Sequence, residues 1–295
     1  MEDQHVEIYS APRGNSFMQK IKTLLKMGKL KKEYISLLTD DEGMELYRNA
    51  FTHISADENN NYEYLEQLGD VTVNKAIVWY LSRRFPKLNC PQGVKIIARL
   101  RIKLVSKKSF SDFGIKLRLW EFVSAEVGVK QNEKKAVLED VFESFFGATE
   151  LLIDQKIRQG AGYAICNNII VKLFDDIEIS LAYNDLFDAV TRLKELFDYY
   201  RPIKDGEERE RAVLGQVKYE NRREQTNQDA GEGVRPTYWQ YVSVFAVKNG
   251  NRELIATGNA ALKADAKQNA AENALIIFKR RGYTRPIPEI YNDIE

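Results

Sequence analysis

Two acidic stretches decide this fold: Tyr62-Glu63-Tyr64-Leu65-Glu66-Gln67-Leu68-Gly69-Asp70 and Leu138-Glu139-Asp140-Val141-Phe142-Glu143-Ser144-Phe145-Phe146-Gly147-Ala148. Glu66 and Asp70 are four residues apart, whereas Asp140 and Glu143 are three apart. Either spacing places both carboxylates on one face of a helix. Because many of their neighbours are apolar, burying these carboxylates without a partner would be costly. The pattern therefore predicts two acidic helix faces that need a positive partner.

A divalent cation shared between the two helices would remove that cost. Ligands that are all carboxylate oxygens and few in number favour Mg²⁺, which keeps several waters and binds phosphate groups. The competing interpretation is that each pair consists of solvated surface acids, and one pair alone would favour it. Two such pairs, together with the motifs around them, favour a metal site with four ligands: Glu66, Asp70, Asp140 and Glu143.

The length and composition are those of an ordinary soluble protein. A chain of 295 residues is long enough for two domains, each with its own hydrophobic core. Hydrophobic residues make up 44% of the chain and charged residues 29%, which is typical of globular proteins. The net charge of +1 does not by itself indicate nucleic-acid binding, so any basic surface must be local.

The cysteines and the apolar segments indicate the cellular compartment in which the protein is expected. Cys90 and Cys166 lie far apart, and with His5 and His53 they cannot build a disulfide framework or a zinc cluster. This usage indicates a reducing, intracellular compartment, and we expect the cytoplasm. Residues 1–20 lack the apolar core of a signal peptide, and no run of about 18 apolar residues occurs. We therefore expect no membrane association and no small-molecule cofactor.

The first half of the chain has the apolar periodicity of helices over residues 18–176. Residues 128–135 are predicted to form a polar loop before the second acidic helix, and residues 154–179 to add one or two closing helices. Trp79 and Trp120 are expected in the core. This half also carries a basic face, for which a solvated helix surface is the simpler interpretation: Arg83, Arg84, Lys87, Lys95, Arg99, Arg101, Lys103, Lys107 and Lys108.

The second half changes to a mixed pattern. Residues 188–199 are predicted to be helical, and residues 215–219 and 241–247 to be strands. Asn249-Gly250 is a hairpin-turn signal before a third strand at 254–258. Residues 264–281 are predicted to form a helix that Gly282 ends. The charge run 204–211 and the polar segment 224–233 are predicted to be loops.

The acidic stretches resemble the motifs of the ribonuclease III family, whose first motif reads approximately Asn-Glu-Arg-Leu-Glu-Phe-Leu-Gly-Asp. Two further segments resemble that family in order and spacing: Ala50-Phe51-Thr52-His53-Ile54-Ser55 and Ala98-Arg99-Leu100-Arg101-Ile102-Lys103-Leu104-Val105-Ser106. The resemblance implies an all-α endonuclease domain over residues 20–180, after an N-terminal extension at 1–19. It implies a Mg²⁺ cofactor, for which Mn²⁺ can substitute, and five catalytic acids: Glu63, Glu66, Asp70, Asp140 and Glu143.

Two residues near these motifs have competing interpretations. The match of Glu63 implies a role in arranging the site or the RNA, but a salt bridge at the rim explains an acid at this position nearly as well. His53 could be a general base. A histidine that packs against a helix is the better interpretation, since a metal-activated water needs no histidine.

The second half resembles the double-stranded-RNA-binding domain, a small α+β domain with the order α-β-β-β-α. Ala256-Thr257-Gly258 followed by residues 263–271 carries the resemblance, which covers residues 184–282 and leaves a C-terminal tail at 283–295. That family places lysines at the start of its last helix, where a helix N-terminus and positive charges favour phosphate. Lys263 and Lys267 match two of them.

Local charge supports the same interpretation. Residues 233–282 contain eight basic and three acidic side chains, so this part is locally basic, and Arg235 is a third candidate for RNA binding. Trp239 could touch RNA, although packing is the simpler interpretation.

The chain departs from both families at a few positions. Gln67 stands where the nuclease family usually has an apolar residue that docks into the partner subunit, so a hydrophobic contact at a dimer interface is lost. Ala264 removes one charge from the lysine cluster. Segment 224–235 has no histidine, and Val234 or a neighbour takes its place. We therefore expect altered dimer contacts and weaker or differently anchored RNA binding.

The resemblances imply an endoribonuclease that cuts double-stranded RNA as a homodimer and leaves 5′ phosphates and short 3′ overhangs. An alternative is a double-stranded-RNA-binding protein without cleavage, which sequesters RNA or serves as a structural subunit of an RNA–protein particle. Such relatives typically lose acids of the site, and this chain keeps all four. A third alternative is a nuclease that needs a different chain as its partner in a heterodimer.

Overall fold

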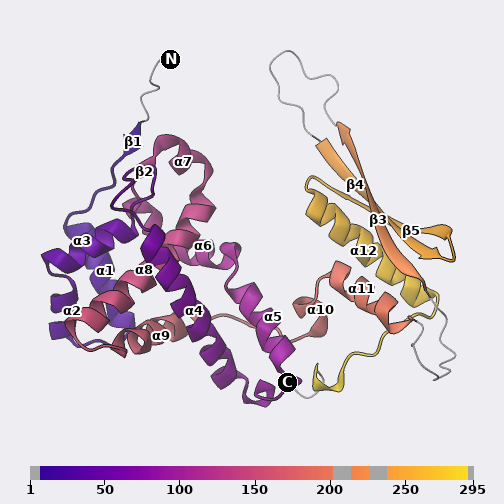
Figure 1. The fold of residues 1–295 in the computed structure, drawn as a ribbon, viewed down its shortest axis with the longest axis horizontal. Helices are drawn as coiled ribbons and strands as arrows, with labels where there is room; N and C mark the ends of the chain where they lie inside the picture. The colour runs from indigo at the N-terminus through magenta and orange to yellow at the C-terminus, as the bar shows by residue number, and fades with distance from the viewer. Residues whose placement is uncertain (1–6, 202–213, 226–237, 292–295) are drawn as a thin grey trace, which may run out of the picture. The chain divides into compact units, whose positions relative to one another are not determined.

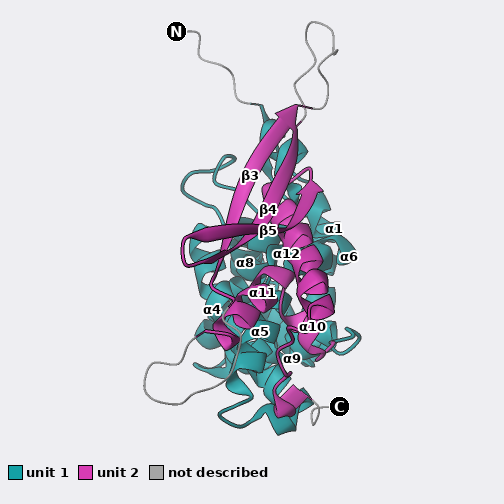
Figure 2. Cartoon of the chain, turned by 90° about the vertical axis from the view of Figure 1, so that its right-hand side faces the viewer, with its two compact units in different colours: residues 1–179 teal, residues 180–295 magenta. Residues whose placement is uncertain are grey.

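The computed structural model describes residues 7–201, 214–225 and 238–291 (Figure 1). The chain divides into two compact units, Met1–Ile179 and Ser180–Glu295 (Figure 2). Each unit has its own core and is described by itself. Within the described residues, no helix is both long enough and apolar enough to cross a lipid bilayer.

The first unit is mostly helical, as the apolar periodicity predicts. Its helices are α1 (Asn15–Met27), α2 (Lys32–Leu38), α3 (Asp41–Ala50), α4 (Glu63–Arg84), α5 (Val94–Leu104), α6 (Lys107–Lys116), α7 (Val127–Asn132), α8 (Lys134–Lys156) and α9 (Ala161–Phe174). Two-residue strands β1 (Ile8–Tyr9) and β2 (Ala125–Glu126) pair antiparallel, which the sequence did not predict. Short 3₁₀ turns occupy Pro86–Leu88 and Leu119–Phe122.

Helix α8 lies at the centre of this unit. Apolar residues surround most of its circumference, and Val137 to Ile153 contains an almost unbroken series of buried positions. A helix that is apolar nearly all round must be covered by neighbours. Aromatic rings supply much of that cover, since Phe142 of α8 stacks on Phe110 and Phe113 of α6 with centroids 4.9 and 5.6 Å away.

The prediction of a polar loop at 128–135 is wrong, because α7 and the first residues of α8 occupy this segment. The side chain of Lys130 explains why a segment with weak helix formers is nevertheless helical. Its ammonium donates to the carbonyls of Trp120 and Val123 and lies 3.9 Å from the Trp120 ring centroid. These tertiary contacts outweigh the local propensity of Gly128 and Asn132.

The tryptophans are less buried than predicted. Trp79 is 54% exposed on the outer face of α4, because its neighbours Ile77 and Tyr80 take the inward positions of that turn. Trp120 is half-buried beneath Lys130 rather than in the core. Trp239 of the second unit is 41% exposed, so it lies outside the core, and the choice between packing and RNA contact stays a prediction.

The second unit contains the predicted helices and strands and some that were not predicted. Its elements are α10 (Tyr183–Leu186), α11 (Ala189–Tyr199), β3 (Gln216–Gln225), β4 (Tyr238–Lys248), β5 (Asn251–Ala260), α12 (Lys263–Arg280) and a 3₁₀ turn at Glu289–Tyr291. The antiparallel sheet has the order β3-β4-β5. Asn249 and Gly250 form the predicted hairpin turn with φ values of 51° and 80°, and Gly282 ends α12 at φ 85°.

Most of the two predicted loops lies outside the described residues, and the part that is described is a strand. Glu224 and Gln225 belong to β3 instead of a loop, because the strand is longer than predicted. The remainder of that loop, 226–233, lies outside the described residues, as do the charge run 204–211, Val234 and Arg235.

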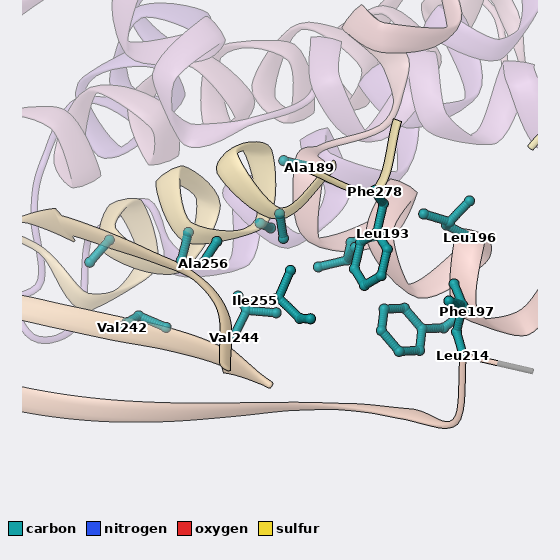
Figure 3. Close-up of a cluster of buried hydrophobic side chains, with 14 residues drawn as sticks. Ala189, Leu193, Leu196, Phe197, Leu214, Val242, Val244, Ile255, Ala256 and Phe278 are labelled. Atoms are coloured by element: carbon teal, nitrogen blue, oxygen red, sulfur yellow. The ribbon is translucent and has the colours of Figure 1, made fainter. Parts of the chain in front are cut away.

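Helices α11 and α12 cover one face of the sheet (Figures 1 and 3). Leu193 and Phe197 of α11 and Phe278 of α12 are buried together with strand residues such as Val244 and Ile255. Alanines on α12 let the helix approach the sheet closely. A Cβ placed on Gly258 of β5 would lie 2.1 Å from the backbone nitrogen of Ala270, so this strand needs a glycine where the helix crosses it.

Candidate metal centre

Helices α4 and α8 cross with their backbones in contact at two glycines. A Cβ placed on Gly69 would lie 1.8 Å from the carbonyl oxygen of Glu143, and one placed on Gly147 would lie 1.9 Å from that of Leu65. Both distances are shorter than any contact a side chain could make, so only glycine fits at either position. The crossing brings the two acidic stretches together, although they lie more than 60 residues apart in the sequence.

The four predicted ligands lie on the two crossing helices, close enough for their charges to interact, and we call them the acidic cluster: Glu66 and Asp70 of α4, Asp140 and Glu143 of α8. Glu143 is buried, with 7% of its surface exposed, and the other three are half-buried. Charges within the cluster act on one another, because Asp70, Glu66 and Asp140 all disfavour ionisation of Glu143.

The pKa values show how strongly these carboxyl groups are crowded. Burial, followed by the charges of Asp70 and Glu66, raises the pKa of Glu143 to about 9. Burial and the charge of Asp140 raise the pKa of Glu66, while a side-chain hydrogen bond with Glu143 lowers it. Burial also raises the pKa of Asp140, against the lowering effect of its hydrogen bond from Tyr62. Desolvation penalises the ionised form of all three groups and like charge that of Glu66 and Glu143, whereas the charges of Lys107 and His53 favour ionisation of Asp140.

Polar side chains outside the cluster orient two of its members. The hydroxyl of Tyr62 donates to Oδ2 of Asp140 at 2.9 Å. The side-chain amide of Asn74 donates to Oδ1 of Asp70 at 2.6 Å. Arg101 donates in turn to the side-chain oxygen Oδ1 of Asn74 at 2.8 Å. Sequence reasoning gave no role to Tyr62 or Asn74, and it placed Arg101 in a basic face and in a segment that resembles the family.

The donor set suits a hard divalent cation. All four side chains offer carboxylate oxygens, and the burial of Glu143 among other acids is costly unless a positive charge compensates it. In their present positions, no three His, Cys, Asp or Glu side chains of the described residues converge closely enough to hold an ion. The fit to Mg²⁺ therefore comes from the chemistry and the shared location of the four acids.

Glu63, Gln67 and His53 lie around the cluster with different surroundings. Glu63 is exposed at the start of α4, and its charge contributes to the raised pKa of Glu66. Gln67 is exposed on the outer face of the same helix. The His53 ring is half-buried, its Nδ1 lies 2.8 Å from the Ser55 hydroxyl, and it packs edge-on against Tyr62 with centroids 5.6 Å apart. These contacts are those of a packing residue.

The predicted RNA-binding lysines lie at the N-terminus of α12. Lys263 is exposed, whereas Lys267 is half-buried with its ammonium 4.5 Å from the Tyr219 ring centroid. Leu262 offers no side-chain cap to the first turn, so its backbone N–H groups remain available to an anion.

Comparison with known proteins places these features in context. The model of the ribonuclease III domain matches residues 63–153, which contain all four acids of the cluster. A putative ribonuclease 3 of Invertebrate iridescent virus 6 is 39% identical over 280 residues, covering 91% of this chain and 89% of that protein. A putative ribonuclease 3 of Frog virus 3 is 34% identical, covering 87% of this chain and 61% of that protein.

Two bacterial proteins are more distant matches. The ribonuclease 3 of Wolinella succinogenes is 27% identical over 244 residues, covering 81% of this chain and 88% of that protein. Among solved structures, the nuclease domain of ribonuclease III from Campylobacter jejuni matches with 26% identity and a TM-score of 0.40, covering 54% of this chain and 97% of that one.

Proposed function

Since the chain belongs to the ribonuclease III family and is an endoribonuclease of that type, we propose that it cleaves double-stranded RNA in a Mg²⁺-dependent reaction. The acidic cluster at the α4–α8 crossing carries this proposal. It joins four carboxylates from two distant stretches of sequence in one partly buried place. Crowding of that kind destabilises a protein, and it is useful when a cation is to be held there.

Each part of the cluster has a proposed task. Glu66, Asp70, Asp140 and Glu143 hold Mg²⁺, and Mn²⁺ substitutes for it. When bound, the metal supplies a Lewis acid that activates water and stabilises the leaving oxygen of a phosphodiester. Glu63 is exposed beside Glu66 and helps to arrange the cluster or the RNA at its rim. The products carry 5′ phosphates and short 3′ overhangs.

The second unit supplies the proposed grip on duplex RNA. Its order of helix, three antiparallel strands and helix is that of a double-stranded-RNA-binding domain, which we assign to residues 184–282 beside a nuclease domain at 20–180. Residues 1–19 and 283–295 form the extension and the tail. Lys263 and Lys267 meet phosphates at the open N-terminus of α12, and Arg235 adds a further positive charge.

A homodimer is the proposed working form. The outer face of α4 exposes an unusual number of large apolar side chains, with Tyr64 65%, Val71 62% and Trp79 54% exposed. Gln67 lies on the exposed side of the same helix, between Tyr64 and Val71. Exposed apolar residues along one helix favour burial against another subunit. A heterodimer would use the same face, and sizing the purified protein distinguishes the two. We place the enzyme in the cytoplasm.

A cleavage assay on long duplex RNA tests the proposal. We expect cleavage with Mg²⁺ and none with EDTA. Asp70→Asn and Glu143→Gln should each abolish cleavage while binding of duplex RNA, measured by gel shift, survives. Asp112→Asn removes an exposed acid of α6 outside the cluster and serves as the control with full activity. Cleavage that persists in both cluster variants would refute the assignment and leave an RNA-binding protein as the better description.

A further inference from the structure

Tyr62 links the two acidic helices through a contact that involves one acid and no metal. It immediately precedes α4, and only 2% of its surface is exposed. Its hydroxyl donates to Oδ2 of Asp140 on α8 at 2.9 Å, across 78 positions of sequence. We propose that Tyr62 is a positioning residue that fixes the Asp140 carboxylate for metal binding, an inference that rests on the proposed function.

Asp140 needs such a constraint because of its surroundings. It is half-buried near the carboxylates of Glu66 and Glu139, while the charges of Lys107 and His53 attract it. Neighbours of both signs favour different side-chain rotamers, so the charges alone do not fix the direction of this carboxylate. The hydrogen bond from Tyr62 fixes that direction by holding Oδ2, and it leaves Oδ1 available to a cation. The bond is charge-assisted, which makes it stronger than one between neutral groups.

The tyrosine is itself held at both its backbone and its ring. Its backbone nitrogen donates to the Thr52 carbonyl at 3.0 Å, and the His53 ring packs edge-on against its own. The backbone nitrogen of His53 donates to the Ser124 carbonyl at 2.9 Å, so this segment is tied to the residues that precede α7. A hydroxyl carried on a ring with so little freedom is pre-organised to orient its partner.

The N-terminal extension reinforces the same segment. The guanidinium of Arg13 donates to the Thr52 hydroxyl at 2.8 Å and to the Phe51 carbonyl at 2.6 Å. Ala11 donates through its backbone nitrogen to the Ser124 hydroxyl at 2.9 Å. Residues before α1 thus support the segment from which Tyr62 reaches Asp140, which gives the extension a role in the site.

Tyr62→Phe tests the inference because it removes the hydroxyl and keeps the buried ring. Tyr47→Phe is the matched control, since Tyr47 is also fully buried. Its hydroxyl lies 3.2 Å from that of Thr149, which is on α8 but is not one of the four acids. Mg²⁺ binding is measured by calorimetry on the full chain without RNA. The Mg²⁺ concentration for half-maximal cleavage and the melting temperature in EDTA are measured in parallel.

We expect Tyr62→Phe to weaken Mg²⁺ binding, and to raise the half-maximal Mg²⁺ concentration, by about tenfold, the effect of losing one hydrogen bond to a charged group. The KM for RNA should stay unchanged, and cleavage should recover at high Mg²⁺. Tyr47→Phe should lower the melting temperature at most and leave Mg²⁺ binding unchanged.

Equal Mg²⁺ affinity in Tyr62→Phe and the wild-type protein would overturn the inference, and so would an equal loss of affinity in Tyr47→Phe. Either result leaves the proposed function intact provided that the wild-type protein needs Mg²⁺. If the wild-type protein cleaves duplex RNA in EDTA, the proposed function itself fails, so the two failures are distinguishable.

Discussion

The acidic cluster of the first unit and the lysines of α12 differ in how the fold holds them. The cluster lies where two helix backbones touch, and Glu143 is 7% exposed. Lys263 is exposed on the first turn of one helix. The chemistry of the cluster therefore depends on packing accurate to a fraction of an ångström. That of the lysines depends on solvated charge near a helix terminus, where the position of the ammonium is loosely defined. Substitutions that disturb the cluster should abolish cleavage, whereas substitutions of the lysines should weaken RNA binding gradually.

The largest effect is expected from Gly147→Ala. The new methyl group would lie 1.9 Å from the Leu65 carbonyl oxygen, so the helices must separate. We expect a loss of about 3 kcal/mol in the free energy of unfolding, measured in denaturant, together with loss of cleavage. Gly14→Ala is the control, because a Cβ at Gly14 would meet nothing within 4 Å. Normal stability and normal cleavage in Gly147→Ala would mean that the crossing tolerates a change in spacing.

A smaller and graded effect is expected from the lysines. The double substitution Lys263→Ala and Lys267→Ala should weaken binding of duplex RNA by about tenfold at low salt, because two phosphate contacts are lost. The difference should shrink as salt rises, while cleavage at saturating RNA stays normal. Lys279→Ala, at the opposite end of the same helix, should bind RNA almost as the wild-type protein does. Loss of cleavage at saturating RNA would show that the lysines act on the chemistry as well.

Helical spacing found the two acidic pairs, and the motifs around them joined the pairs into one predicted site. Helical spacing puts Glu66 with Asp70 and Asp140 with Glu143, and the apolar neighbours indicate that these faces turn inwards. Asn74 lies four residues after Asp70 on one helix, a spacing that the same rules cover, although its contact was not predicted. These rules cannot find Tyr62, because a hydrogen bond across 78 residues leaves no periodic signal. They also predicted a loop at 128–135, where the contacts of Lys130 with Trp120 stabilise a helix. Periodicity reports on one helix at a time, whereas these features depend on two segments meeting.

Glu143→Gln tests whether the cluster is maintained at the expense of stability. The amide keeps a donor for the hydrogen bond with Glu66 and removes one of the crowded carboxyl groups. We expect the variant to be more stable than the wild-type protein in EDTA by about 1 kcal/mol, visible as a melting temperature a few degrees higher. Added Mg²⁺ should raise the melting temperature of the wild-type protein and not that of the variant. A variant that is less stable in EDTA would mean that the acids are not under repulsive strain.

The smallest effect is expected at Arg101, which acts on the cluster through Asn74. Its guanidinium contacts the Asn74 carbonyl, which fixes the direction in which the Asn74 amide donates to Asp70. Arg101→Ala removes one of the contacts that orient that amide. The second bond of Asn74, to the backbone carbonyl of Asp70 at 2.9 Å, still restrains it. We therefore expect the half-maximal Mg²⁺ concentration to rise by about twofold to threefold, corresponding to part of one hydrogen bond. Lys95→Ala removes an exposed positive charge from the same helix α5 and separates this effect from a general loss of basic surface. If both variants shift the Mg²⁺ dependence equally, Arg101 acts through its charge alone, and the support of the cluster ends at Asn74.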